Sequence, residues 1–263
     1  MIGAIFGDIV GSVYEFNNHR SKDFPLLARS CFFTDDTVMT IALAKALMDS
    51  DTENEQEFKS NFINEMHILG EKYPDRGYGG RFALWLARKA KEPYNSYGNG
   101  SAMRVSPVGW YAKDLDEAIR LARWSAEVTH NHPEGVKGAV ATAGAIFLAR
   151  TGKDKKEIAD FISQYYKIDF TLDQIRPSYK FNETCQKTVP QALACFLEAT
   201  SFEDAIRNSV SIGGDSDTLG AICGAVAEAF YSLTKKERDS ALFFLDSYLK
   251  NIVLSFESKY IAD

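Results

Sequence analysis

Two short stretches of this chain place carboxylate and hydroxyl side chains directly before an apolar segment. Residues 34–37 read Thr-Asp-Asp-Thr, and residues 215–218 read Asp-Ser-Asp-Thr. One acceptor is enough to cap the first turn of a helix, whereas each stretch offers several. Carboxylate and hydroxyl oxygens are also the ligands that a hard divalent cation requires. Capping explains either stretch alone, but the two together favour a cation site.

These oxygens are enough for two ions if both helix starts face one cavity. Two ions a few ångström apart form an arrangement that is used in hydrolytic chemistry. The candidate cation ligands are Thr34, Asp35, Asp36, Asp215, Asp217 and Thr218.

Two other interpretations of residues 215–218 can be tested on the sequence. An EF-hand loop that starts at Asp215 requires an oxygen ligand at position 219 and Glu at position 226, but these positions hold Leu219 and Val226. That interpretation is excluded. A phosphatase with an aspartyl nucleophile places its Asp-x-Asp at the end of a buried strand, whereas here Ser-Ile-Gly-Gly precedes the motif and a helix is predicted after it. A metal-dependent phosphatase therefore remains only as an alternative.

A third set of carboxylates lies near the N-terminus. The spacing of Asp8, Ser12 and Glu15 predicts one face of a helix, which is either a solvated stripe or part of a site. Glu15 stands just before Phe-Asn-Asn, where the chain can turn it towards a cavity. A second face of the same helix can pack closely against a neighbour, because it carries Gly3, Gly7 and Gly11.

Two loops carry groups that can hold a ligand. Residues 97–104 read Tyr-Gly-Asn-Gly-Ser-Ala-Met-Arg, a stretch whose backbone N–H groups can face an anion or simply form a tight turn. Arg104 can pair with a phosphate or anchor the loop. His130 and His132 form a His-x-His pair, but the spacing of the other residues suggests no third zinc ligand. One histidine is therefore expected to donate a hydrogen bond to a ligand and the other to shape the loop.

The rest of the chain predicts helices and little else. Apolar residues recur three and four positions apart from end to end, and residues 38–48 and 137–149 are apolar enough for the interior of a bundle. The helix after residue 216 carries Gly220 and Gly224, which form a groove for another backbone. Residues 235–258 predict one or two closing helices. The polar breaks are too short for a domain linker, so residues 1–263 are expected to form one domain.

Composition excludes several classes of protein. The net charge of −6, from 36 acidic and 30 basic residues, gives no basic surface for nucleic acid. The four cysteines show no paired short spacing, so a reducing, cytoplasmic setting is expected. No stretch reaches the roughly 20 apolar residues that span a bilayer, and the N-terminus lacks the basic region of a signal peptide. We therefore expect no nucleic-acid or membrane partner, and a monomer.

Five stretches, in this order, make the sequence resemble the ADP-ribosylglycohydrolase family, which includes the dinitrogenase reductase-activating glycohydrolase and the ADP-ribosyl-arginine and ADP-ribosyl-serine hydrolases. Each stretch is a weak signal alone, but together they cover nearly the whole chain. They are GAIFGDIVGSVYEF (3–16), FTDDTVM (33–39), YGNGSAMRVSPVG (97–109), THNHPEGVKGA (129–139) and GGDSDTLGAICGAVAEA (213–229).

The resemblance implies a compact, single-domain, all-α fold, a multi-helix orthogonal bundle with two Mg²⁺ or Mn²⁺ ions in a central cleft. It implies that the candidate cation ligands named above hold these ions, and that Glu15 is a mobile glutamate beside the bond to be cleaved. Glu15, Asp36 and Asp217 are then the candidate catalytic residues. The resemblance also implies a set of residues that bind the diphosphate and the distal ribose: Gly98, Asn99, Gly100, Ser101, Met103, Arg104 and His130.

The activity that the resemblance implies is hydrolysis of the bond between C1'' of the distal ribose of ADP-ribose and an acceptor such as an arginine or serine side chain. The partner is then an ADP-ribosylated protein or a small ADP-ribose conjugate. The acceptor does not follow from the resemblance, because family members choose it largely through peripheral loops and this chain is short between its motifs. A protein that binds ADP-ribose without cleaving it is an alternative from another class.

Overall fold

The computed structural model describes residues 1–261, and these residues form helices without any strand. The expected all-α fold class is therefore confirmed. An isolated bridge between Gly98 and Thr184 is the only strand-like pairing in the described part of the chain. The helices are α1 (Ile2–Gly11), α2 (Asp35–Asp49), α3 (Glu55–Lys72), α4 (Gly80–Ala87), α5 (Gly100–Met103), α6 (Ser106–Tyr111), α7 (Leu115–Glu127), α8 (Pro133–Arg150), α9 (Lys155–Ser163), α10 (Leu172–Ile175), α11 (Cys185–Glu198), α12 (Phe202–Ser211), α13 (Ser216–Tyr231), α14 (Lys235–Phe243) and α15 (Ser247–Tyr260).

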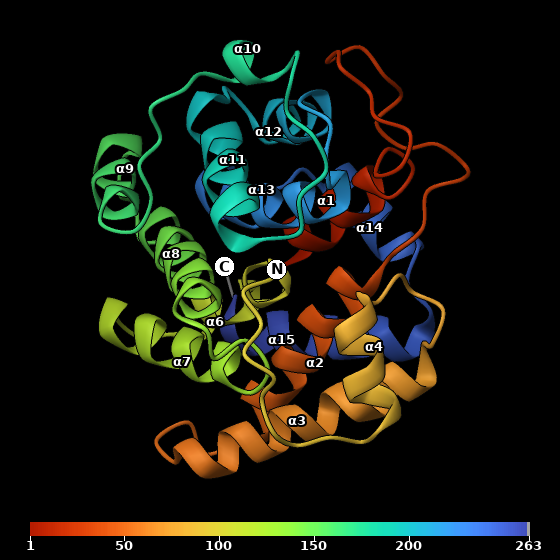
Figure 1. Ribbon diagram of the computed structural model, residues 1–263, viewed down its shortest axis with the longest axis vertical. Helices are drawn as coiled ribbons and strands as arrows, with labels where there is room; N and C mark the ends of the chain where they lie inside the picture. The colour runs from red at the N-terminus through yellow and green to blue at the C-terminus, as the bar shows by residue number, and fades with distance from the viewer. Residues whose placement is uncertain (262–263) are drawn as a thin grey trace.

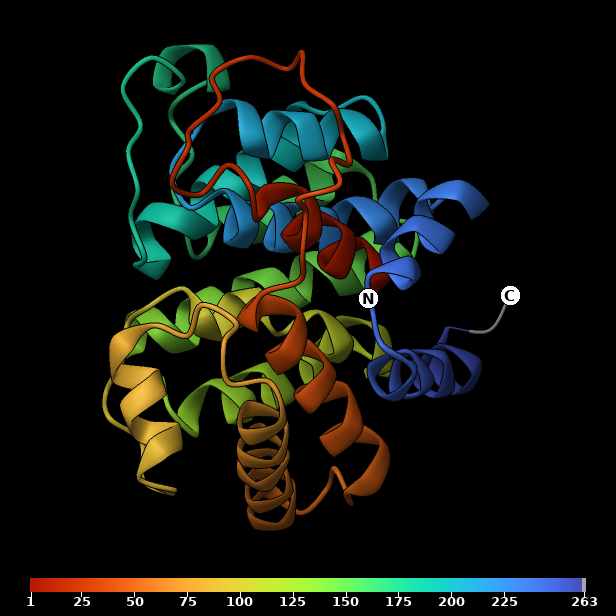
Figure 2. The same ribbon diagram turned by 90° about the vertical axis from the view of Figure 1, so that its right-hand side faces the viewer.

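The helices lie in two halves that share one core. Helices α1, α11, α12 and α13 lie in one half, and α2, α3, α4 and α7 lie in the other (Figures 1 and 2). Helix α8 contacts helices of both halves, α7 and α13 among them. The main cluster of buried apolar side chains draws residues from both halves. The predicted interior helices at 38–48 and 137–149 are α2 and α8, and the closing segment 235–258 forms two helices.

Helix α1 packs against α13 with almost no space between the two backbones. A Cβ atom placed on Gly7 would lie 2.0 Å from the carbonyl oxygen of Gly220, and one on Gly3 would lie 2.4 Å from that of Gly224. A Cβ on Gly11 would likewise lie 2.3 Å from the Ser216 oxygen. The predicted close-packing faces of both helices are thus confirmed. Their antiparallel register brings the C-terminal end of α1 beside the first turn of α13.

The prediction that Asp8, Ser12 and Glu15 share one helical face is wrong. Helix α1 ends at Gly11, and Ser12 is its C-cap, whose backbone N–H bonds to the Asp8 carbonyl oxygen. The chain then turns, since Tyr14 N–H donates to the Gly11 carbonyl oxygen at 2.8 Å. Glu15 therefore lies in an irregular segment after the helix.

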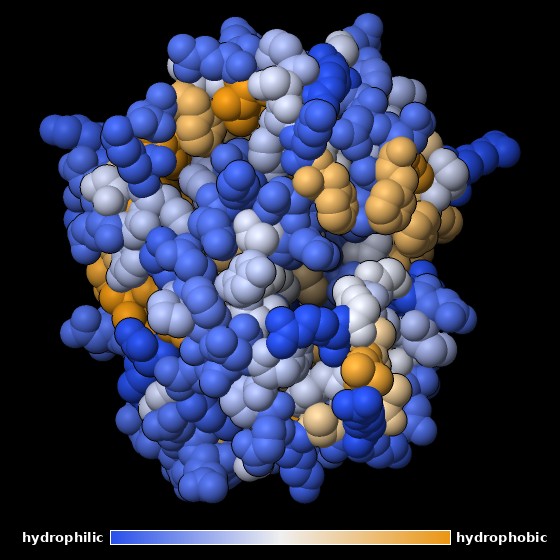
Figure 3. All heavy atoms as spheres, viewed as in Figure 1, coloured by the Kyte–Doolittle hydropathy of each residue, from blue (hydrophilic) through white to orange (hydrophobic). Residues whose placement is uncertain are grey.

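The surface viewed in Figure 3 is mostly hydrophilic, with apolar groups in separate patches. All four cysteines are buried and free, which agrees with the absence of a disulfide framework in the sequence pattern. Among the described residues, none of the helices combines the length and the apolar composition that crossing a membrane requires.

We expect Gly7→Ala to destabilise the protein by about 1–3 kcal/mol or more, because the new methyl group would collide with the Gly220 backbone rather than with a movable side chain. Urea denaturation measures this change. Gly80→Ala is the matched control, since a Cβ there meets no atom within 4 Å. Equal free energies of unfolding for the two variants would contradict the close packing.

Candidate active site

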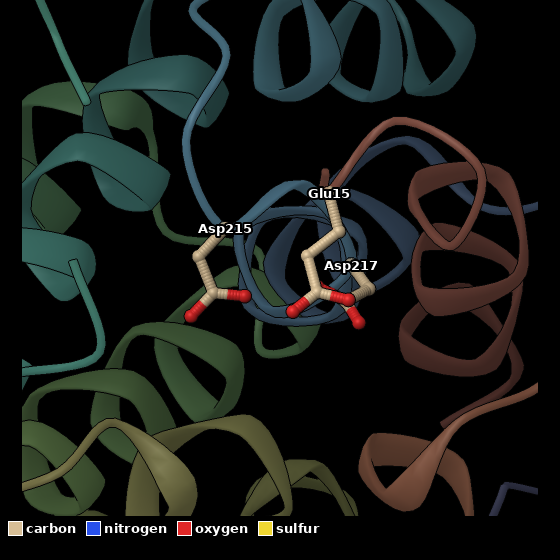
Figure 4. Close-up of side chains that lie close together, drawn as sticks. All are labelled: Glu15, Asp215 and Asp217. Atoms are coloured by element: carbon tan, nitrogen blue, oxygen red, sulfur yellow. The ribbon is translucent and has the colours of Figure 1, made fainter. Parts of the chain in front are cut away.

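Carboxylates from two distant parts of the chain converge at one place. Glu15, Asp215 and Asp217 each offer an oxygen, and these oxygens lie within 4.8 Å of one another. In Figure 4 the three carboxylates point to the same side, Glu15 from the segment after α1 and both aspartates from the start of α13. Asp36, at the start of α2, joins them, because its Oδ2 atom lies 3.4 Å from Thr218 Oγ1. The two acidic helix starts therefore meet, as the sequence predicted.

The first turn of α2 is held in place by Asp8 from α1. Asp8 is completely buried, and its carboxylate accepts hydrogen bonds from the backbone N–H and the hydroxyl of both Thr34 and Thr37. Thr34 Oγ1 lies 2.7 Å from Asp8 Oδ1, so its proton is directed to Asp8 and its lone pairs remain for another partner. Thr34 is also the N-cap of α2 and accepts from Asp36 N–H.

Asp8 was not among the predicted cation ligands or catalytic residues, and of its two alternatives the solvated stripe is excluded because Asp8 is completely buried. The sequence does contain a signal for a buried carboxylate at this position. Asp8 stands between Phe6-Gly7 and Ile9-Val10, and no other residue of the helix is charged. A helix that is apolar on all sides belongs to the core, and a carboxylate within it must find donors.

The first turn of α13 is arranged differently from an ordinary helix cap. Asp215 is the N-cap, but its side chain makes no capping hydrogen bond to the first turn of the helix that it begins. Instead its Oδ2 atom accepts from the Asn99 amide at 2.6 Å. Gly213 and Gly214 precede it with φ values of 71° and 83°, which favour glycine. Capping therefore explains Thr34 but does not explain Asp215.

The cluster carries strongly perturbed carboxyl groups. Burial, followed by the charges of Asp217 and Asp8, raises the pKa of Glu15 to about 8. Burial also raises the pKa of Asp215 to about 6. For Asp36 and Asp217 burial again dominates, and neighbouring carboxylates add to it, so that both pKa values lie well above the ordinary value. Bringing several acids together in a buried place makes each harder to ionise.

Among the described residues, no basic side chain forms a salt bridge with Glu15, Asp35, Asp36, Asp215 or Asp217. In addition, Asp36 Oδ1 is buried and has no hydrogen-bond partner in the described part of the chain. An all-oxygen donor set with an orphaned buried carboxylate oxygen fits a hard divalent cation. The residues present therefore suit the predicted cofactor.

Residues 98–101, which we call the glycine-rich loop, lie beside this cluster. Asn99 joins the two, because its amide donates to Asp215 while its backbone N–H donates to the Glu183 carbonyl oxygen at 2.8 Å. Gly98 and Gly100 are partly exposed, whereas Ser101 is fully buried and its hydroxyl donates inward to the Gly135 carbonyl oxygen at 2.6 Å. The two glycines are thus the accessible part of the loop, whereas Asn99 is buried and the Ser101 side chain lies beneath the loop.

The expectation that Arg104 contacts the substrate needs correction. Its guanidinium is almost completely buried and donates to the Ser125 carbonyl oxygen and to Thr129 Oγ1, both at 2.9 Å. It also lies over the ring of Phe62. A side chain so enclosed anchors the loop, which was the second possibility that the sequence left open. Met103 is likewise buried in the core cluster.

His130 is positioned through Arg104. Because arginine can only donate, Thr129 Oγ1 must accept from Arg104, and the hydroxyl proton is then free to bond to His130 Nδ1 at 2.7 Å. This assigns the proton of the neutral ring to Nε2. A Cβ placed on Gly100 would lie 3.1 Å from that atom, so the N–H faces the glycine-rich loop. Burial, followed by the charges of Arg104 and Arg81, lowers the pKa of His130 well below its ordinary value.

His132 has a structural role in this arrangement. It is the N-cap of α8, and its Nδ1 atom accepts a hydrogen bond from Glu134 N–H at 3.1 Å. Its ring also packs edge-on against Tyr97, with 5.3 Å between the ring centroids. Of the two histidines, His130 is therefore the one that faces the glycine-rich loop.

Fold and site together define an all-α protein with an oxygen-only acidic centre beside a glycine-rich loop. The chain belongs to the ADP-ribosylglycohydrolase family, whose model matches residues 1–235. It is similar to ADP-ribosylhydrolase ARH3 of Mus musculus, with 28% identity across 89% of this chain and 83% of the relative, and to that of Homo sapiens, with 27% identity across 89% and 84%.

Two further similarities extend this picture. An uncharacterized protein of Escherichia coli, YegU, is 26% identical across 76% of this chain and 72% of its own length. A solved structure described as an ADP-ribosylglycohydrolase-related protein complex matches the fold with a TM-score of 0.64 and 22% identity, over 98% of this chain and 96% of that one. The likeness to the solved structure supports the all-α fold.

The raised carboxyl pKa values predict how stability depends on pH. From about pH 4 to about pH 8 the folded protein binds more protons than the unfolded chain, so in chelator this cluster lowers stability as pH rises. A divalent cation that binds the ionised carboxylates offsets that loss. We expect the rise in melting temperature on adding Mg²⁺ to be larger at about pH 8 than at about pH 5.5. Calorimetry that found no such difference would contradict the cation site.

The hydroxyl of Thr129 is predicted to fix the His130 tautomer. In two-dimensional ¹H–¹⁵N spectra at neutral pH we expect His130 to carry its proton on Nε2, and Thr129→Val to abolish this preference because Nδ1 loses its donor. Thr129→Ser keeps the hydroxyl and is the matched control. His130→Gln identifies the resonance. An unchanged tautomer in the valine variant would overturn the assignment.

Proposed function

We propose that this protein hydrolyses the glycosidic bond between ADP-ribose and an acceptor such as an arginine or serine side chain. The observation that carries the proposal is the meeting of the two acidic helix starts beside the glycine-rich loop, in a member of the ADP-ribosylglycohydrolase family. The names of the ARH3 relatives support the same class of reaction. The substrate is then an ADP-ribosylated protein or a small ADP-ribose conjugate.

The reaction is proposed to use two divalent cations, Mg²⁺ or Mn²⁺. When bound, they supply positive charge that holds the ribose hydroxyls and lowers the pKa of a water molecule. Asp36 offers its unpartnered Oδ1 atom for this purpose. The full proposed set of ligands is Thr34, Asp35, Asp36, Asp215, Asp217 and Thr218.

Glu15 is proposed to handle the proton of the reaction. Cleavage of a glycoside passes through an oxocarbenium-like transition state and requires help for the leaving group. The Glu15 carboxyl lies beside the carboxylates of Asp215 and Asp217, and from this position it would donate a proton to the departing acceptor. Asp217, whose carboxylate lies beside that of Glu15, and Asp36, at the start of α2, would orient the reacting groups.

Binding of the ADP-ribose part is proposed to come from the other side of the cluster. The partly exposed Gly98 and Gly100 would let the diphosphate approach the backbone closely, and the Nε2–H group of His130, which lies beside Gly100, would donate a hydrogen bond to the ligand. Contacts remote from the bond to be cleaved supply binding energy that orients the sugar. Asn99 contributes indirectly, because its amide fixes the carboxylate of Asp215.

The proposal predicts a strict need for cations and for Asp215. Peptides that carry ADP-ribosyl-arginine or ADP-ribosyl-serine are incubated with Mg²⁺ or with excess chelator, and released ADP-ribose is measured. We expect Asp215→Ala and chelator each to lower turnover by about 10²-fold or more, because several transition-state contacts depend on them. Asp173→Ala, on an exposed side chain, is the matched control for removal of a carboxylate.

Other outcomes would overturn parts of the proposal. Full turnover in chelator or by the Asp215 variant would exclude the cation centre. Tight binding of ADP-ribose without cleavage of either peptide would favour a binding protein. Phosphate release from simple phosphomonoesters would favour a phosphatase, although Asp215 and Asp217 follow α12 and begin α13 rather than ending a strand as an aspartyl phosphatase requires.

A further inference from the structure

The segment that carries Glu15 contains no helix, so something other than helical hydrogen bonds must fix it. The side chain of Asn18 lies within this segment and bridges it to the turn before Asp215. Asn18 Nδ2 lies 2.8 Å from the Glu15 carbonyl oxygen and 3.2 Å from that of Tyr14. On the other side, Asn18 Oδ1 accepts from Gly214 N–H at 2.8 Å, while Nδ2 lies 3.4 Å from the Gly214 carbonyl oxygen. The side-chain amide of Asn18 thus connects the segment that carries Glu15 with the turn that precedes Asp215.

The turn at Gly213 and Gly214 is shaped to receive this amide. A Cβ atom on Gly213 would lie 2.8 Å from Asn18 Oδ1, so a larger residue would displace the side chain. The positive φ of both glycines turns the Gly214 peptide towards Asn18. Arg20 adds a second anchor, since its guanidinium donates to the Ile212 carbonyl oxygen at 2.9 Å. The segment is therefore fastened at two points to residues 212–214.

We infer that Asn18 is a positioning residue for Glu15. The carboxylate of Glu15 reaches the space beside Asp215 and Asp217 (Figure 4), although its own side chain makes none of the hydrogen bonds found among the described residues. Its place is set by its backbone, and Asn18 connects that backbone to the turn from which Asp215 begins. The expected effect of Asn18 on catalysis rests on the proposed function of Glu15. The hydrogen bonds of Asn18 do not depend on that function.

The activity test separates positioning from general support of the fold. We expect Asn18→Ala to lower kcat by about tenfold and to leave KM within about twofold, because a misplaced proton donor affects the transition state more than binding. Asn17→Ala is the matched control, since Asn17 is an exposed neighbour that makes none of these contacts. Normal activity of the Asn18 variant, or an equal loss in the Asn17 variant, would overturn the inference.

A double-mutant cycle tests whether Asn18 acts through Glu15. In a Glu15→Gln background, measured by single-turnover kinetics, Asn18→Ala is expected to have little further effect, because the group that it positions is already inactive. A second tenfold loss in that background would show that Asn18 supports the fold or the cation ligands instead, and would overturn the inference.

Hydrogen exchange provides a readout that does not depend on catalysis. With Mg²⁺ present, we expect the backbone amides of residues 13–20 to exchange faster in Asn18→Ala than in wild type or Asn17→Ala, with the amides of α13 unchanged. If wild type cleaves neither peptide, the proposed function fails, and this measurement alone decides whether Asn18 holds the Glu15 segment. Unchanged exchange over residues 13–20 would overturn the inference whatever the activity.

Discussion

The site depends on the contact between two backbones, that of α1 and that of α13. Glycines at intervals of four on each helix let the two approach until a single methyl group at Gly7 would overlap the Gly220 carbonyl oxygen. Its register, which pairs Gly7 with Gly220 and Gly3 with Gly224, sets where the two helices begin and end relative to each other. Asp8 is brought under the start of α2, and the chain that leaves α1 is brought beside Asp215. The glycines of α1 and α13 therefore determine where the charged side chains of the site lie.

A second constraint acts against this packing. The carboxylates that meet at the two helix starts are buried without a basic partner, and burial of unpaired charge is costly. Burial raises the pKa values of Asp36 and Asp217 well above the ordinary value, and the buried Asp8 of α1 receives four donors from Thr34 and Thr37. A cluster of this kind is a poor way to stabilise a fold. The energetic cost of burying these carboxylates is better explained by a positively charged ligand.

The sequence predicted the parts of the structure that depend on local pattern. The interior helices and the glycine faces of α1 and α13 follow from such patterns, whereas the meeting of the two acidic helix starts was implied by the resemblance to the family. Prediction from the sequence failed where the outcome depends on three-dimensional surroundings. Nothing in residues 97–104 shows that the Arg104 side chain turns inward to Thr129 while the glycines stay at the surface. The end of α1 at Gly11 was also missed, because the segment after it is fixed by contacts with residues almost 200 positions away.

The network on the proposed ADP-ribose side differs from that around Glu15. On the ADP-ribose side the contacts are buried and continuous, from Arg104 through Thr129 to His130, and from Asn99 to Asp215. Around Glu15 they are hydrogen bonds of Asn18 that are partly open to solvent. Contacts of the first kind are costly to alter, because each lost partner leaves a buried polar group unpaired. Contacts of the second kind can vary at small cost to stability, so the part of the site around Glu15 can change in sequence while the buried network on the other side is kept.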